Sequence, residues 1–209
     1  LIRLRPQLFR PPATAAMRFI GDFTIDPAIC DRLVELHRVC DRQGLVKRGG
    51  IGRADATVVD LAKKDSYDLT VSAIPDDLHD RFGVPAYYKA LQGCVEQYLQ
   101  QHPVLAKVGL FKVTESPAIQ HYRPGGGFKL EHFERTGLAT TTRMLVWMTF
   151  LNDMDVGAGG TRFVYQDVTF DARKGRTLIW PTDFTHTHVG VVSETQHKSI
   201  ITGWFNFVT

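Results

Sequence analysis

The chain is poor in cysteine, and this narrows the kinds of site it can hold. Among its 209 residues there are three cysteines, Cys30, Cys40 and Cys94. An odd number of thiols cannot pair completely into a disulfide framework, and none of the three has the Cys-x-x-Cys spacing of a zinc or redox motif. We therefore expect three reduced, buried thiols in a soluble, cytoplasmic protein.

The sequence also lacks long apolar runs and clusters of positive charge. No stretch approaches the roughly 20 consecutive apolar residues of a membrane span, so no membrane partner is expected. The net charge of +3 comes from scattered Lys and Arg, which argues against a nucleic-acid partner. Residues 1–16 are rich in Arg and contain no acid. We expect a poorly ordered leader there, followed by a single domain over residues 17–209, whose oligomeric state the sequence leaves open.

Two helices are predicted in the first half of the chain. Asp26 and Pro27 form a typical helix start, and apolar residues then recur at three- and four-residue steps to about residue 44. A second apolar stripe predicts a helix over residues 85–102, which Pro103 ends. Residues 47–73 contain Gly, Asp and Lys among few apolar residues, and predict a loop with one short strand.

The second half consists of short β-branched and aromatic runs separated by turn residues. They lie at 118–122, 128–132, 143–151, 161–164, 168–170, 177–180 and 199–207. Such spacing is typical of an antiparallel sandwich or barrel. Helices followed by strands give an α+β fold in which the helices brace one sheet.

His132, His186, His188 and His197 all lie in the β-rich half, where Glu131 and Glu134 are close to His132. His132 and Glu134 are two residues apart on a predicted strand, so both side chains leave the same face. With His188 from a later strand they would form a two-His-one-carboxylate triad, which leaves three positions open on non-haem Fe(II). His186 is an alternative to His188. Lys198 follows on the last predicted strand, and a buried cation beyond the metal suits a dicarboxylate cosubstrate.

Six sequence blocks between residues 119 and 207 resemble the Fe(II)/2-oxoglutarate dioxygenases, and among them the prolyl 4-hydroxylase-like branch. In chain order they are YRPGGGF at 122–128, HFE at 132–134, RMLVWMTFLN at 143–152, GGTRF at 159–163, GRTLIW at 175–180, and HVG at 188–190 with KSIITGW at 198–204. The resemblance implies a double-stranded β-helix, or jelly-roll, core. It favours His188 over His186 because of the spacing to Lys198.

The resemblance also implies the chemistry. His132, Glu134 and His188 would bind Fe(II), while Lys198, Tyr122 and Thr202 would bind the distal carboxylate of 2-oxoglutarate. The implied enzyme is a dioxygenase that uses O₂, with ascorbate as reductant, to hydroxylate a C–H bond, and it needs no catalytic residue beyond the metal ligands. A prolyl residue in a peptide or protein is the leading substrate. A free amino acid, a small natural product, a non-catalytic metal-binding jelly roll and a hydrolytic zinc enzyme are the alternatives.

The sequence departs from this family at two positions. Glu134 stands where the commoner motif has Asp, and Phe150 stands where many relatives have Tyr, which removes one hydroxyl from the implied cosubstrate site. Arg143 has two readings, since it either pairs with a carboxylate near the site or caps the sheet. Residues 47–85 and 135–141 are the regions where substrate selectivity is expected, because loops commonly carry it.

Overall fold

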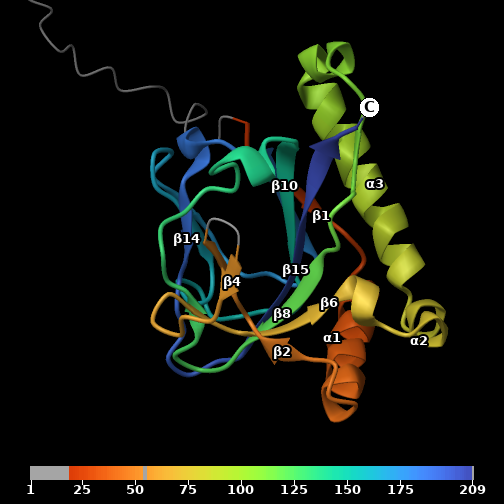
Figure 1. Cartoon of the computed structure of the whole chain (residues 1–209), viewed down its shortest axis with the longest axis vertical. Coiled ribbons are helices and arrows are strands. Elements are labelled where there is room, and N and C mark those ends of the chain that lie inside the picture. Colours follow the sequence, from red (N-terminus) through yellow and green to blue (C-terminus); the bar gives the residue numbers. More distant parts are fainter. Residues whose placement is uncertain (1–18, 54–55, 209) are drawn as a thin grey trace, which may run out of the picture.

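The computed structural model describes residues 19–53 and 56–208, and its core is built from two facing sheets (Figure 1). The larger, eight-stranded sheet has the order β1-β13-β10-β15-β8-β6-β2, with β7 also paired to β15. The smaller sheet has the order β12-β11-β14. The larger sheet comprises β1 (Gly21–Thr24), β2 (Lys47–Arg48), β6 (Tyr67–Thr70), β7 (Phe111–Lys112), β8 (Ala118–Tyr122), β10 (Arg143–Phe150), β13 (Arg176–Pro181) and β15 (Lys198–Phe207). The smaller comprises β11 (Thr161–Phe163), β12 (Val168–Phe170) and β14 (His188–Gly190).

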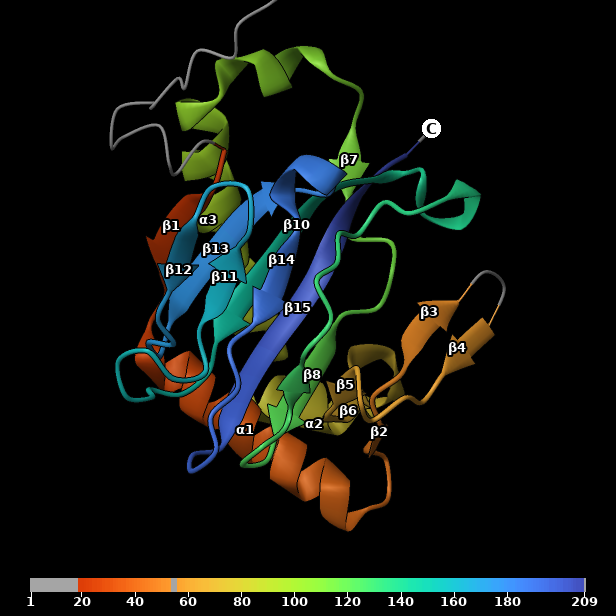
Figure 2. The ribbon, with the colours of Figure 1, turned by 90° about the vertical axis from the view of Figure 1, so that its left-hand side faces the viewer.

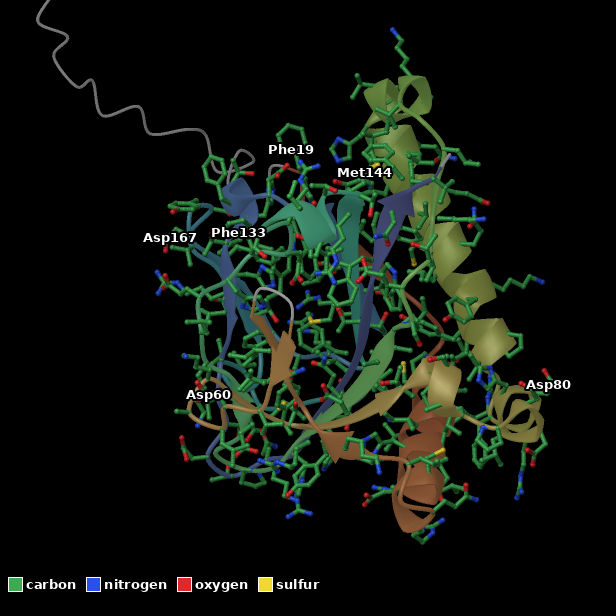
Figure 3. All side chains as sticks on the ribbon, in the orientation of Figure 1. Phe19, Asp60, Asp80, Phe133, Met144 and Asp167 are labelled. Carbon is green, nitrogen blue, oxygen red and sulfur yellow. The ribbon has the colours of Figure 1, made fainter. Side chains whose placement is uncertain are left out.

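The central strands of the larger sheet are buried on both faces, as β10 shows. Its sequence RMLVWMTF is apolar at almost every position, as expected for a strand covered on both sides. Leu145 and Trp147 belong to the apolar cluster beneath the helices, whereas Val146 and Met148 belong to the cluster between the two sheets. Side chains fill this space between the sheets (Figure 3). The α+β jelly roll that the sequence predicted is therefore confirmed.

Helices α1 (Pro27–Arg42) and α3 (Val84–Gln101) cover the outer face of the larger sheet (Figure 1). The Asp26 side chain caps α1 by accepting the Ala28 amide at 2.9 Å. From α3, the buried Tyr87 hydroxyl hydrogen-bonds Thr149 of β10 at 2.9 Å. Both predicted helices are confirmed, with ends within about two residues of the predicted ones. No helix in the described part of the chain is long and apolar enough to cross a membrane.

The region predicted as a loop with one strand contains more structure than that. Besides β2 and β6 it holds β3 (Ile51–Arg53), β4 (Ala56–Val58) and β5 (Lys64–Asp65), and a helix α2 (Asp76–Arg81) follows. The β3–β4 hairpin extends away from the larger sheet (Figure 2). These strands have two to four residues, and apart from the β3–β4 hairpin they pair with segments about 20 or more residues away, as β6 does with β8. Such short strands carry no periodic signal.

The strand predicted over residues 128–132 is also different. Only β9 (Gly127–Phe128) is a strand, and it pairs with β5. His132 makes a single antiparallel bridge with His188. The leader predicted over residues 1–16 lies outside the described residues. The three cysteines are free and buried, as predicted.

Candidate metal centre

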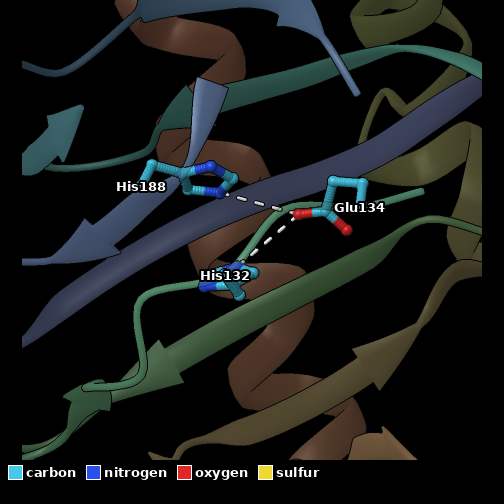
Figure 4. A group of neighbouring side chains, drawn as sticks. All are labelled: His132, Glu134 and His188. Atoms are coloured by element: carbon cyan, nitrogen blue, oxygen red, sulfur yellow. Dashed lines mark ion pairs between the residues drawn. The ribbon is translucent and has the colours of Figure 1, made fainter. Parts of the chain in front are cut away.

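His132, Glu134 and His188 lie together between the two sheets (Figure 4). Oε1 of Glu134 is 3.5 Å from Nε2 of His132 and 3.6 Å from Nε2 of His188. One ligand atom from each residue lies within 4.8 Å of the others. The backbone brings the two histidines together: the N–H of His132 donates to the His188 carbonyl at 3.0 Å, and the reverse bond is 2.9 Å long.

Both imidazoles are oriented by a backbone carbonyl. Nδ1–H of His132 donates to the Leu130 carbonyl at 2.8 Å, and Nδ1–H of His188 donates to the His186 carbonyl at 2.9 Å. Each bond fixes the proton on Nδ1 and leaves the lone pair of Nε2 facing Glu134. This is the tautomer that a metal ligand requires.

Aromatic rings enclose the two histidines. His188 is buried, with the ring centroids of Trp180 and Phe163 at 5.1 Å and 5.6 Å from its own. The Phe128 ring stacks on His132 at 3.8 Å. Burial, and then the neighbouring His132, lowers the pKa of His188 well below its usual value. His188 is therefore neutral at pH 7, as a ligand must be.

The other histidines of this half lie elsewhere. His186 is in the 3-10 turn Phe184–His186, and its ring is not part of the cluster of three. Nδ1 of His197 is hydrogen-bonded to Nε2 of His121 at 3.1 Å. Of the two candidates that the sequence left for the third position, the structure brings His188 to His132 and Glu134.

The donor set fits a six-coordinate divalent metal. Two ligands at about 2.1 Å and at right angles lie about 3 Å apart, so the observed 3.5 and 3.6 Å need only a small contraction. Two imidazole nitrogens and one carboxylate oxygen match the facial triad of non-haem Fe(II). A closed structural zinc site would need a fourth protein ligand, and no fourth donor joins this group in the described part of the chain.

Lys198 is a buried cation at the start of β15. Its Nζ donates to the Gly160 carbonyl at 3.3 Å and lies 5.5 Å from the ring centroids of Tyr122 and Phe150. Among the described residues no carboxylate is within ion-pair distance of this ammonium group. Burial lowers the pKa of Lys198 from 10.5 to about 7. A bound anion would supply the missing counter-charge.

Tyr122 and Thr202 lie on the same inner sheet face as Lys198. Tyr122 pairs directly with Lys198 across β8 and β15, and Thr202 is four residues along β15. Their hydroxyls already have partners, because Tyr122 donates to Oε1 of Gln120 at 2.6 Å and Thr202 to the Trp147 carbonyl at 2.9 Å. The carboxylate-binding role of these residues stays a prediction.

Arg143 and Trp204 approach Glu134 from the other side. Nε1 of Trp204 donates to Oε2 of Glu134 at 2.9 Å, and Nη1 of Arg143 is 3.7 Å from the same oxygen. Of the two interpretations of Arg143, the structure supports the one in which it pairs with a carboxylate near the site. Trp204 was not among the predicted site residues, although its six-residue spacing from Lys198 places it on the same strand face.

A polar cavity of about 310 Å³ adjoins Trp204. Gln120 and Thr202 line it from β8 and β15, and Arg48, Lys64 and Asp68 line it from the region where selectivity was expected. Lys64 is buried and forms an ion pair with Asp68 at 2.6 Å. Residues 135–141 contribute no side chain to this cavity.

Comparison with solved structures places this architecture among prolyl hydroxylases. The chain is similar to a Pseudomonas putida prolyl-4-hydroxylase, with a TM-score of 0.67 and 16% identity over 92% of this chain and 95% of that one. It is similar to a viral collagen prolyl hydroxylase from Paramecium bursaria Chlorella virus-1, in complex with 2OG, with a TM-score of 0.63 and 15% identity over 91% and 97% of the two chains.

A third similar structure is a Trichoplax adhaerens prolyl hydroxylase in complex with a peptide fragment of hypoxia inducible factor. Its TM-score is 0.66 at 13% identity, over 93% of this chain and 87% of that one. No protein-family model matches the sequence, and no curated protein matches it either. At these identities the likeness concerns the fold, and the chain has the fold of the prolyl 4-hydroxylases.

Proposed function

We propose that this protein is an Fe(II)- and 2-oxoglutarate-dependent dioxygenase that hydroxylates a prolyl residue in a peptide or protein. One combination carries the proposal: a triad of two imidazoles and a carboxylate, with a buried lysine that lacks a counter-charge beside the same apolar cluster between the two sheets. A metal-binding module without enzymatic activity has no use for the second feature, since a structural metal needs no anion site beside it.

Each residue has a defined part in this proposal. His132 and His188 offer Nε2, and Glu134 offers Oε1. Lys198 binds the distal carboxylate of 2-oxoglutarate, with Tyr122 and Thr202 as further hydroxyl groups for the same anion. Iron with 2-oxoglutarate and O₂ supplies the oxidising chemistry, in which 2-oxoglutarate is converted to succinate and CO₂ while one oxygen atom enters the substrate C–H bond.

The surrounding side chains keep the reaction away from water. Phe128, Phe163 and Trp180 enclose the two imidazoles. This apolar wall raises the strength of the charge interactions at the site and limits unproductive oxidation. Ascorbate is the proposed reductant, and it would keep the bound metal as Fe(II).

The polar cavity beside Trp204 is the proposed substrate side. Trp204, whose Nε1 bonds Glu134, is one of its lining residues, and others come from residues 47–70, within the region where selectivity was expected. The similarity to prolyl hydroxylases of four kinds of organism, one with a bound peptide, favours a peptidyl proline over a free amino acid.

Succinate formation tests the chemistry. Purified protein with Fe(II), ascorbate and 2-oxoglutarate is expected to release succinate under air, and His132→Ala is expected to abolish this. Lys198→Ala is expected to raise the 2-oxoglutarate concentration needed. Lys174→Ala, which removes a lysine paired with Asp31 on the surface, is the matched control. No iron-dependent succinate in the wild type, or equal turnover in His132→Ala, would refute the proposal.

The substrate is tested separately. A panel of proline-containing peptides and free amino acids is incubated with the active protein, and an added oxygen atom is sought by mass spectrometry. Hydroxylation of peptides is the expected result. Turnover of free amino acids with none of any peptide would leave the oxygenase chemistry standing and replace the prolyl substrate by a small molecule.

A further inference from the structure

The two oxygens of Glu134 have different surroundings. Oε1 faces both imidazoles, whereas Oε2 accepts a hydrogen bond from Nε1 of Trp204 and lies 3.7 Å from Arg143. In Figure 4 both dashed lines end on one carboxylate oxygen and the other points away from the histidines. The carboxylate is therefore held so that one oxygen faces the metal position.

The two groups that hold Oε2 are themselves fixed. The guanidinium of Arg143 lies 3.7 Å over the Trp204 ring, a stacked cation-π contact. Nη1 of Arg143 also donates to the backbone carbonyl of Glu134 at 3.2 Å. Both Arg143 and Trp204 come from adjacent strands of the larger sheet, β10 and β15.

Glu115 anchors this pair from behind. Nε of Arg143 donates to Oε1 of Glu115 at 2.8 Å, Nη2 donates to the other oxygen, and Asn206 donates to Oε1 at 2.7 Å. Burial acts to raise the pKa of Glu115, but the bonds from Arg143 and Asn206 lower it below the ordinary value. Glu115 is thus ionised at pH 7, and a bidentate carboxylate leaves the guanidinium little freedom to turn.

A glutamate ligand needs such contacts to fix its carboxylate. Its side chain has one more rotatable bond than aspartate, and a free carboxylate can bind a metal through one oxygen or through two. Binding through both oxygens would occupy a position that the proposed cosubstrate and O₂ require.

We infer that Trp204 and Arg143 are positioning residues that restrict Glu134 to binding metal through Oε1 alone. The inference rests on the proposed function, and it assigns to this chain the arrangement that lets a glutamate stand in the place of an aspartate. Loss of a group that orients a metal ligand typically weakens metal affinity about 10- to 100-fold.

Binding of Co(II) to the full chain under anaerobic conditions tests this without turnover. Trp204→Phe keeps a ring beneath Arg143 and removes the N–H, and it is expected to raise the Co(II) dissociation constant about tenfold. The visible absorption of bound Co(II), which depends on the number and geometry of its ligands, is expected to change as well. Trp147→Phe is the matched control, because Trp147 lies on the opposite face of the sheet and its Nε1 has no hydrogen-bond partner among the described residues.

A double-mutant cycle separates the hydrogen bond from simple packing. In Glu134→Asp the shorter carboxylate cannot both reach the metal and bond Trp204, so adding Trp204→Phe is expected to change affinity less than about twofold. Equal losses in both backgrounds would overturn the inference. Arg143→Lys, which keeps the charge but cannot bond Glu115 and Glu134 together, is expected to shift affinity and spectrum in the same direction as Trp204→Phe.

The outcomes distinguish this inference from the proposed function. If the wild type binds Co(II), and Trp204→Phe has the same Co(II) affinity and absorption as Trp147→Phe, the positioning role of Trp204 is refuted and the metal site stands. If the wild type does not bind Co(II), or if His132→Ala binds Co(II) as well as the wild type does, the metal site is refuted. The proposed role of Trp204 and Arg143 is then refuted with it.

Discussion

His132 and His188 exchange two backbone hydrogen bonds, and this pair is the point where a connecting segment is attached to the smaller sheet. His132 is not part of a longer strand, so the bridge has no neighbouring ladder bonds to support it. Glu134 adds one more backbone bond, from its N–H to the Thr182 carbonyl at 3.1 Å. A metal bound to these three side chains would cross-link the segment to β14.

Metal binding is therefore expected to stabilise the fold. At a free metal concentration 100 times the dissociation constant, the expected gain is about 2.7 kcal/mol in the free energy of unfolding. Thermal denaturation of chelator-treated protein with and without Co(II) or Mn(II) measures it. His132→Ala is expected to lose the gain.

A second pair of histidines provides the control. Ring nitrogens of His121 and His197 are 3.1 Å apart and could bind added metal weakly. His197→Gln is expected to keep the full stabilisation by metal. If stabilisation by metal persists in His132→Ala and disappears in His197→Gln, the metal binds at His121 and His197, and the result counts against the triad.

Lys198→Met is expected to stabilise the protein while removing cosubstrate binding. The buried ammonium group has one carbonyl partner at 3.3 Å and no carboxylate partner in the described part of the chain. A methionine of similar length removes a burial cost of about 1 to 3 kcal/mol. Chemical denaturation gives the stability, and titration of the metal-loaded protein with 2-oxoglutarate gives the binding.

The pH dependence of this gain has a definite sign. The pKa of Lys198 is about 7 in the folded protein and 10.5 as the ordinary value, so between these pH values the unfolded chain binds more protons. Lys198 thus contributes stability that rises with pH over this window. The advantage of Lys198→Met is expected to be largest below pH 7 and to shrink toward pH 10. A lower stability of Lys198→Met at pH 6 would contradict this account.

The sequence predicted that His132, Glu134 and His188 lie together, but it predicted the local structure around them less well. Runs of β-branched and aromatic residues located β10 and β15, and apolar stripes located α1 and α3, because long elements give a long pattern. His132 and Glu134 were expected on a strand, yet a single bridge and side-chain bonds bring them together with His188. The motif predicted that the three side chains meet. It did not predict the backbone bridge between His132 and His188 that brings them together.

Most other contacts between distant segments were beyond the reach of the sequence. The pairing of β2 with β6 and of β5 with β9, and the link from Trp204 through Arg143 to Glu115, depend on residues that meet only in the folded chain. Trp204 was recognised as a strand residue, but nothing in its neighbours indicates that its N–H meets Glu134. Alternation tells which face a side chain occupies and not which partner it finds.

The surroundings of His121 lead us to expect a lower free energy of unfolding in acid, independent of the metal centre. Its Nδ1 hydrogen-bonds Ser199 at 2.9 Å, and its ring lies 5.6 Å from His37 on one side and 5.2 Å from His197 on the other. Burial, and then the nearby His37, His197, Arg123 and Arg38, lowers the pKa of His121 from 6.5 to about 4. Every one of these charged neighbours is a cation or becomes one in acid.

The sign follows from the proton balance. Between pH 6.5 and pH 4 the unfolded chain holds a proton at this position that the folded protein does not, so stability falls as the pH falls through this window. His121→Gln keeps a hydrogen-bonding group without the charge, and is expected to recover about 1 to 2 kcal/mol at pH 4.5, after allowance for solvent screening at this partly exposed site. Urea denaturation of metal-free wild type and His121→Gln at pH 7.5 and pH 4.5 measures the difference. His79→Gln serves as the control, because His79 lies in α2 and its Nε2 bonds the Val71 carbonyl. If His79→Gln recovers as much stability in acid as His121→Gln does, the loss is a general charge effect and not a property of the His37, His121 and His197 cluster.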